Sequence, residues 1–138
     1  MKKINYYFKD ITVSKNNLCA KYKIEEFILK EKKNVKEINF IFCKDNYLQK
    51  INEEHLQHVD LTDVITFEHS QGNNLIGDIY ISVDRVKENA SKFSVTFKSE
   101  ISRVMIHGVL HLIGYNDKSK RQIEKMRKME NKFLKNVL

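Results

Sequence analysis

The chain has 138 residues, 41% of them hydrophobic, and a formal net charge of +7 at pH 7. This length and apolar content suffice for one buried core, so we expect a single domain over residues 1–138. No run approaches the roughly 18 apolar residues of a membrane span, and the first residues lack the apolar segment of a secretory signal. These features predict a cytoplasmic protein with no membrane partner.

Strands and helices are predicted to be mixed along the first two thirds of the chain. Strands are favoured where β-branched and aromatic side chains partly alternate with polar ones, in residues 4–8, 38–43, 64–68 and 76–82. Helices are favoured where apolar residues recur three and four apart, in residues 18–30 and 46–56. A further short helix is expected after Ser82, whose hydroxyl can cap it.

Two helices close the chain, and their ends are marked more clearly. The first is predicted over residues 97–113, with Gly114 where a left-handed C-terminal residue belongs. The second is predicted to begin at Ser119, because Ser-Lys-Arg-Gln matches a capping box. Its mostly apolar stripe comprises Ile123, Met126, Glu130, Phe133, Leu134 and Val137. Strands mixed with packed helices predict an α+β fold built on one small mixed β-sheet.

The positive charge is concentrated at the end of the chain. From Lys118 onward there are eight basic residues and two acidic ones. Such an excess attracts polyanions and makes their binding sensitive to salt, because phosphate contacts release counterions. A solvated helix face in a lysine-rich protein explains the same pattern, so the charge alone leaves both interpretations open.

The stretch HGVLHLIGYND, residues 107–117, carries the chemistry of the chain. In a helix His107 and His111 lie one turn apart on one face, so both imidazoles can reach a single point. Their neighbours are apolar on nearly every side, which predicts burial. A buried imidazole without a partner costs about 1 to 3 kcal/mol, so two of them on one turn indicate a shared partner.

Gly114 and Asp117 supply the rest of a metal-binding pattern. They follow His111 at the third and sixth positions, which is the spacing of the zincin signature HxxxHxxGxxH with Asp in place of the last His. Glycine lets the chain reverse, and two imidazoles with one carboxylate suit zinc while leaving a fourth position for water. Bound zinc lowers the pKa of that water to about 7. Nickel or manganese can also take these ligands.

Gly108 separates this pattern from the zinc proteases. Those enzymes use HExxH, in which Glu is the general base, and here Gly108 occupies the position of that Glu. A metallopeptidase is therefore disfavoured. Phosphodiester cleavage demands less of a carboxylate there, because the metal polarises the phosphoryl oxygen while basic groups balance the developing charge.

At this point the sequence resembles the bacterial YbeY endoribonucleases, also called rRNA maturation factors. Their motif HGxLHLxGYDH is similar to HGVLHLIGYND here, their TDVLSFP is similar to TDVITFE, and their LGDIxIS is similar to IGDIYIS. The motifs occur in the same order at similar spacing. Glu124, Met126, Glu130 and Leu134 also fit the last helix of the family, so that the resemblance covers roughly residues 38–138.

The resemblance implies a zincin-like fold and a single-strand-specific, metal-dependent endoribonuclease. The implied role is rRNA maturation, especially at the 3′ end of the small-subunit rRNA, and ribosome quality control. The implied partners are single-stranded RNA and the small ribosomal subunit or its assembly factors, with no DNA. The implied ligands of a catalytic zinc, whose water attacks the phosphodiester, are His107, His111 and Asp117. Asp117 stands where the family usually has His, which lowers the charge of the site by one unit and makes the bound water less acidic.

A second departure concerns the RNA contact. The family often has an arginine six residues before the threonine of TDV, and here that residue is Leu56. His58, close by in sequence, can supply a cation or a hydrogen bond, or can be a surface loop residue. We also expect Lys118, Lys120 and Arg121 to contact RNA.

Three acidic residues are candidates to support the ligand imidazoles through their second N–H groups. Asp63 and Asp78 belong to the TD and GD motifs, and each can instead cap a strand or a turn. Glu100 lies seven residues before His107, on a similar helix face, where it can orient a ligand or remain a surface residue.

Three functions therefore follow from the sequence. The metal-dependent endoribonuclease is favoured by the metal-binding pattern together with the family motifs. A ribosome-assembly module with a structural metal and little catalysis is the alternative that Leu56 motivates. A metallopeptidase is the least favoured, because of Gly108.

Overall fold

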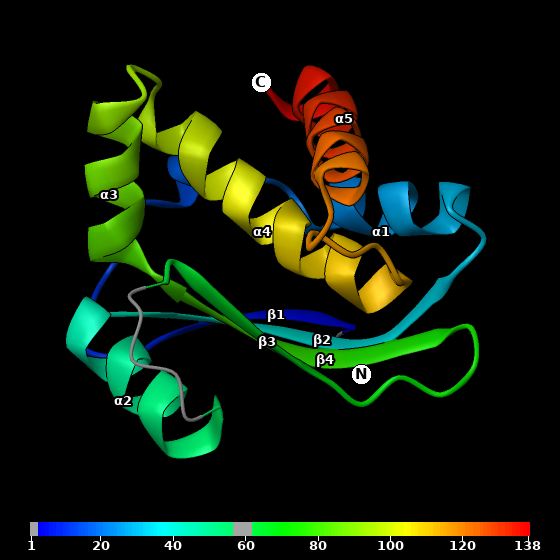
Figure 1. Cartoon of the computed structure of the whole chain (residues 1–138), viewed down its shortest axis with the longest axis horizontal. Helices are drawn as coiled ribbons and strands as arrows, with labels where there is room; N and C mark the ends of the chain where they lie inside the picture. Colours follow the sequence, from blue (N-terminus) through cyan, green and yellow to red (C-terminus); the bar gives the residue numbers. More distant parts are fainter. Residues whose placement is uncertain (1–2, 57–61) are drawn as a thin grey trace.

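The fold is organised around one mixed β-sheet (Figure 1). The computed structural model describes residues 3–56 and 62–138. Within these residues the sheet has four strands in the order β1-β2-β4-β3. Their bounds are Ile4–Phe8 for β1, Asn34–Cys43 for β2, Val64–Glu68 for β3 and Asn74–Ser82 for β4. β1, β2 and β4 run parallel and β3 pairs antiparallel with β4, so the predicted α+β class with a mixed sheet is confirmed.

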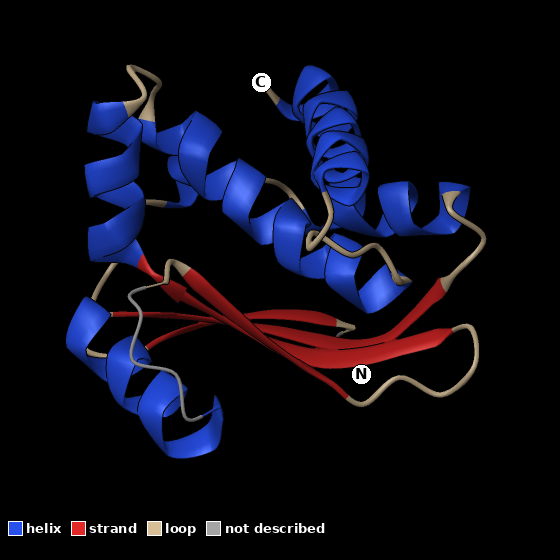
Figure 2. Cartoon of the chain, in the orientation of Figure 1, coloured by secondary structure: helices blue, strands red, loops and turns tan. Residues whose placement is uncertain are grey.

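The helices cover the two faces of the sheet unequally (Figure 2). Their bounds are Lys21–Lys30 for α1, Asp45–Leu56 for α2, Val83–Lys92 for α3, Phe97–Ile113 for α4 and Lys120–Val137 for α5. One face of the sheet packs against α1 and α4, and the other face packs against α2. α5 lies across α4 and α1 on the side away from the sheet.

The alternation along the strands separates a fully apolar face from one that carries both polar pairs and a smaller apolar cluster under α2. Phe40 and Ile79 are fully buried on the face that packs under α4. Asn39 and Asp78, each one position away, point to the other face, where the Asn39 amide donates to the Asp78 carboxylate over 3.0 Å. Burying each large side chain contributes about 1.5 to 3 kcal/mol, so the apolar face holds α4 in place.

Glycine lets α4 approach the sheet unusually closely at two points. A Cβ atom on Gly108 of α4 would lie 2.7 Å from Ile79 Cγ2, and one on Gly77 of β4 would lie 2.6 Å from Leu112 Cδ2. Neither distance is tolerated between carbon atoms without a shift of the neighbour. These two residues therefore set the height of α4 above the sheet, and with it the position of both histidines.

The structure differs from the predicted elements mainly at their starts, since β4 begins at Asn74 rather than at residue 76 and α2 begins at Asp45 rather than at residue 46. β2 begins at Asn34 rather than at residue 38. The helix predicted over 18–30 begins at Lys21, because Leu18 ends a 3-10 turn and Ala20 is extended. Ile123, predicted in the apolar stripe of α5, is 49% exposed, although Met126, Phe133 and Leu134 of the same stripe are buried.

The other predicted features agree with the structure. Ser119 caps α5 with the complete capping box, and Ser82 caps α3. Across residues 3–56 and 62–138, no helix combines the length and the apolar character needed to cross a bilayer.

Candidate metal centre

α4 brings the two histidines to the edge of the core. Thr96 caps this helix by accepting from the Ser99 N–H over 3.0 Å. Val104 and Leu110, which flank the histidines, are buried beneath it, whereas the His107 and His111 side chains keep 23% and 29% of their exposure. The apolar side chains therefore fix the helix, and the imidazoles emerge together on its open side.

Gly114 ends α4 and turns the chain back toward the histidines. Its φ of +124° is a conformation that L side chains rarely adopt. Its N–H donates to Leu110 O and His111 O, both at 3.1 Å, and the N–H of Tyr115 also donates to Leu110 O. These bonds satisfy the last carbonyl groups of the helix and aim Asp117 at the imidazoles.

The loop that carries Asp117 is anchored on both sides. Before it, the Tyr115 hydroxyl donates to Glu31 over 2.6 Å, and burial, followed by the charge and hydrogen bond of Glu31, raises the pKa of Tyr115 to about 12. After it, the backbone N–H groups of Lys118 and Ser119 both donate to Gln122 Oε1. Asp117 thus lies between two fixed points.

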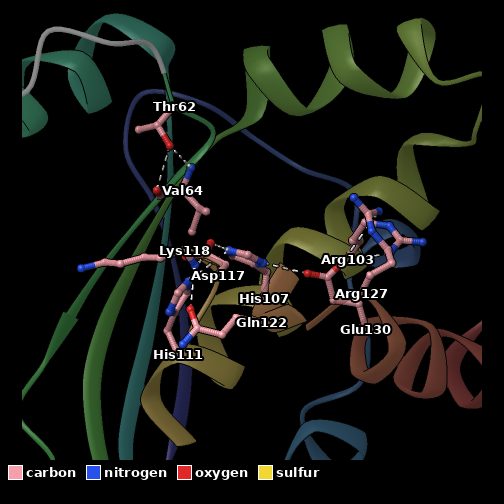
Figure 3. A network of polar contacts seen from close by, with 10 residues as sticks. All are labelled: Thr62, Val64, Arg103, His107, His111, Asp117, Lys118, Gln122, Arg127 and Glu130. Atoms are coloured by element: carbon pink, nitrogen blue, oxygen red, sulfur yellow. Dashed lines mark hydrogen bonds and ion pairs between the residues drawn. The ribbon is translucent and has the colours of Figure 1, made fainter. Parts of the chain in front are cut away.

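The three predicted ligand side chains meet in a nearly equilateral triangle of donor atoms (Figure 3). His107 Nε2 and His111 Nε2 are 3.2 Å apart, and Asp117 Oδ2 lies 3.3 Å from each. Ligand atoms at two corners of a zinc tetrahedron with bonds of about 2.0 Å are about 3.3 Å apart. The residues therefore fit a tetrahedral metal ion in spacing and in donor type, with one corner left for another ligand.

Glu130 of α5 fixes the orientation of His107, a role that the sequence analysis missed. Its Oε2 lies 2.7 Å from His107 Nδ1, and its Oε1 accepts from Arg103 over 2.9 Å. Arg127 approaches Oε1 at 3.8 Å. When His107 donates its Nδ1–H to this carboxylate, its Nε2 lone pair points at the triangle. The indication in the sequence was that Glu130, a charged residue, occupies a position in the apolar stripe of α5.

The charged groups of this network stabilise one another's charged forms. Burial opposes the charged forms of both His107 and Glu130. The hydrogen bond and charge of Glu130, with the charges of Asp117 and Asp63, outweigh burial and raise the pKa of His107. The hydrogen bonds from His107 and Arg103 likewise hold the pKa of Glu130 below its usual range. Glu130 is therefore an anionic acceptor at neutral pH, as a carboxylate that supports a metal-binding imidazole must be.

Comparison with known proteins identifies the family of this chain. The sequence profile of endoribonuclease YbeY matches residues 4–138. The chain belongs to the YbeY endoribonuclease family. This membership confirms the resemblance that the motifs predicted, and it confirms an endoribonuclease, a hydrolase, as the enzyme class of the family.

Relatives from several bacteria cover most of the chain. The endoribonuclease YbeY of Flavobacterium psychrophilum is 54% identical over 112 residues, which are 81% of this chain and 80% of that protein. That of Karelsulcia muelleri is 45% identical over 135 residues, which are 95% of this chain and 93% of that protein. The solution structure of a Thermotoga maritima protein has a TM-score of 0.66 and 32% identity, and the match covers 96% of this chain and 90% of that protein. The predicted fold is thus also the fold of a solved structure.

The three acidic residues predicted to support the imidazoles have different surroundings. Asp78 lies on the sheet face away from α4 and pairs with Asn39, so its predicted role beside a ligand is wrong. Asp63 lines a groove of about 400 Å³ together with His107, but its carboxylate accepts from Asn89 over 3.5 Å. Glu100 also faces that groove and is 5% exposed, which excludes a surface role. Glu130 is the carboxylate that contacts His107 Nδ1, the role that was predicted for these three residues.

The residues predicted to contact RNA are only partly within the described structure. Lys118, Lys120 and Arg121 are exposed and follow Asp117 into the first turn of α5. Figure 3 shows Lys118 beside Asp117 with its amino group directed away from the imidazoles. Leu56 is the last residue of α2, but its side chain, like the whole of His58, lies outside the described residues.

Gly108 faces the sheet rather than the donor triangle. Its nearest neighbours in place of a Cβ are Ile79 and Thr66 Oγ1, the latter at 3.2 Å. A glutamate at this position would be directed into β3 and β4. This helix therefore has no room for the general base of HExxH, which is a structural reason to disfavour peptide hydrolysis.

Proposed function

We propose that this chain is a zinc-dependent endoribonuclease that cleaves single-stranded RNA during maturation of the small-subunit rRNA 3′ end. The observation that supports it best is the donor triangle of His107, His111 and Asp117, whose edges of 3.2 to 3.3 Å match a tetrahedral zinc ion. The endoribonuclease name of the family relatives supports RNA as the substrate.

Zinc at this position would act as a Lewis acid on a phosphoryl oxygen and would lower the pKa of a bound water. The protein residues prepare the site for this chemistry. Glu130 accepts the Nδ1–H of His107 and so keeps its Nε2 free, while Arg103 balances the charge of that carboxylate. Asp117 adds a negative charge that holds the cation firmly.

Zinc is favoured over nickel and manganese by the donor set. Two imidazole nitrogens and one carboxylate oxygen are typical of catalytic zinc with an open fourth position. Manganese prefers more oxygen donors, and nickel prefers planar or octahedral arrangements. The near-equal edges of the triangle support the tetrahedral choice.

Basic residues beside the triangle would hold the RNA backbone. Lys118, Lys120 and Arg121 are exposed at the N-terminal end of α5, where the helix dipole also favours anions. The small ribosomal subunit or its assembly factors are the partners that this substrate implies, and the cytoplasm is the compartment in which they are found. The whole chain acts as one domain in this proposal.

The test compares zinc-loaded wild type with His111→Ala on single-stranded RNA that carries the small-subunit rRNA 3′ end. We expect wild type to cut this RNA and to hold one zinc ion, and we expect the variant to lose both properties. His69→Ala is the matched control, because it removes an exposed histidine outside the triangle. The same RNA annealed to its complement should remain uncut.

Two other results would replace the proposal. Tight binding of the RNA without cleavage by folded, zinc-loaded wild type would establish the assembly module with a structural metal. Release of peptides from a protein substrate, lost in His111→Ala, would establish the metallopeptidase. Equal cutting by wild type and His111→Ala would show that the triangle does not perform the chemistry.

A further inference from the structure

A groove of about 400 Å³ opens beside the donor triangle. Its floor is α4, from Glu100 to His107, and its walls come from α3, from the residues that lead into β3, and from α5. Asp117 of the donor triangle also lines it. Pockets of this volume accept one small organic ligand, and an RNA strand bound across the triangle would pass directly by the opening.

Glu100 contributes to this groove a carboxylate without a partner. The residue is 5% exposed, and no hydrogen bond or ion pair of its side chain exists within residues 3–56 and 62–138. Arg103, three residues along α4, directs its guanidinium to Glu130 and Asn131 instead. A carboxylate of such low exposure is poorly hydrated, so the position favours a ligand that donates N–H groups to it.

The groove also has apolar walls that a planar ring can contact. Val64, at the start of β3, and Met126 of α5 line it. Phe93, which ends α3, and Ile123 of α5 line it as well and are 57% and 49% exposed. These two side chains give the groove an apolar rim, and an aromatic ring offers a platform on which a base can stack. The exposure of Ile123, which contradicted the predicted stripe, then has a reason.

A second metal ion is a poorer occupant of this groove. Within the described part of the chain, only His107, His111 and Asp117 bring three ligand atoms close enough for a cation. Of the other carboxylates that line the groove, Asp63 accepts from Asn89, Glu130 accepts from Arg103, and Asp117 belongs to the donor triangle. Arg103 and Arg127 also line the groove, and their positive charges oppose a cation while they favour a phosphate.

We propose that this groove binds one unpaired nucleobase next to the cleaved bond, with Glu100 accepting a hydrogen bond from the amino group of the base. This inference rests on the proposed RNA substrate. Cytosine, adenine and guanine carry such an amino group, whereas uracil would turn carbonyl oxygens toward the carboxylate. A specific contact between a carboxylate and the cytosine amino group is a recognised means of reading a base. The groove thus gives the enzyme a preference for bases with an amino group over uracil.

The test measures the binding of cytidine 5′-monophosphate and uridine 5′-monophosphate to the zinc-loaded protein by NMR titration. Neither nucleotide contains an internal phosphodiester, so cleavage does not interfere. We expect wild type to bind the cytidine nucleotide at least about fivefold more tightly. Glu100→Gln should bring the ratio close to one, because the amide can both donate and accept. Glu124→Gln is the matched control on an exposed residue of α5 and should keep the wild-type ratio.

Several outcomes would overturn the inference. A ratio near one in wild type would do so, and so would an unchanged ratio in Glu100→Gln. Displacement of the cytidine nucleotide by an equal concentration of a short peptide would show that the groove serves a peptide instead. Cleavage of single-stranded RNA is assayed on the same samples. Absence of cleavage with a retained nucleotide preference would reject the proposed function and leave the nucleobase site standing.

Discussion

The two ends of α4 differ in whether their polar side chains have hydrogen-bond partners in the protein. At the C-terminal end, His107 contacts Glu130, His111 and Asp117, and each of these groups has a partner within the network. In the N-terminal half, Glu100 is as buried as Glu130 but has no partner of its own in the described residues. Glu100 and Glu130 line one groove and are equally buried, so exposure does not explain the difference between these two carboxylates.

The difference separates two kinds of binding. A network in which every group is oriented by another suits a ligand that stays, such as a metal ion, because its donors must remain in place. A lone acceptor suits a ligand that comes and goes, because its hydrogen bond is completed only when that ligand arrives. The variants below test whether the two ends of α4 behave in these two ways.

The largest effect is expected from Glu130→Ala. The change leaves His107 and the half-buried Arg103 without their shared acceptor, which should lower the free energy of unfolding by about 3 kcal/mol. Zinc affinity should fall about 10- to 100-fold, because the imidazole loses its orientation. Urea denaturation and competition with a chelating dye measure the two effects. Unchanged zinc affinity would show that the C-terminal end does not depend on Glu130.

Gly108→Ala should have the next largest effect. Its Cβ would lie 2.7 Å from Ile79 Cγ2 and 3.0 Å from Ile79 Cδ1, in a fully buried contact. Overpacking of this kind costs about 2 kcal/mol and should lift α4 from the sheet. Thermal unfolding detects the loss of stability. A melting temperature equal to that of wild type would mean that Ile79 can move aside, and that α4 is not held at a fixed height.

Gly114→Ala should have a smaller effect on stability, of about 1 kcal/mol. A Cβ at this position meets no atom within 4 Å, so the cost comes from the backbone conformation at φ +124°. Because the turn aims Asp117, zinc affinity should also fall. Gly72→Ala is the matched control, since it has φ +59° and equal space but lies in the turn between β3 and β4. An equal loss of zinc affinity in both variants would refute the link between the turn and the triangle.

The C-terminal end of α4 was predictable because its information is local. The spacing of His107, His111, Gly114 and Asp117 along one helix and one turn determines where their side chains lie, whatever the rest of the chain does. The strands were predictable for the same reason, through their alternation. Only their ends were misplaced, where polar residues such as Asn34 continue a ladder that the pattern of side chains does not mark.

The remaining features depend on how distant elements pack. Glu130 reaches His107 across 23 positions of the chain, and no periodicity predicts that α5 crosses α4 at this turn. The alternation of β4 shows that Asp78 shares a face with Tyr80, but not which face α4 would cover. Ile123 continued the stripe of α5, and its exposure follows from the groove that separates the start of α5 from α3. Sequence spacing therefore predicted which side chains supply the ligand atoms, but not that Glu130 orients one of them.

The smallest effect is expected at the N-terminal half, where Glu100→Gln should stabilise the protein at neutral pH. Burial raises the pKa of Glu100, and the charges of Asp63 and Glu130 add to this, while Arg103 and Arg127 oppose it. The folded protein therefore binds the proton of this carboxyl group more tightly than the unfolded chain does. The contribution of this group to the free energy of unfolding is fully present below the ordinary glutamate pKa of about 4.3. It is lost as the pH rises through the raised pKa of the folded state.

Glutamine has no proton to lose, so the stability gained by Glu100→Gln should be near zero at about pH 4 and should grow to a plateau at higher pH. Urea denaturation across this range measures the gain, with Glu124→Gln as an exposed control that should show no such pH dependence. A variant no more stable than wild type at pH 8 would mean that the carboxylate has a partner after all, and the contrast between the two ends of α4 would disappear. A clear gain in stability, together with a lost preference among nucleotides, would mean that the chain keeps a destabilising carboxylate for its ligand, as binding sites often do.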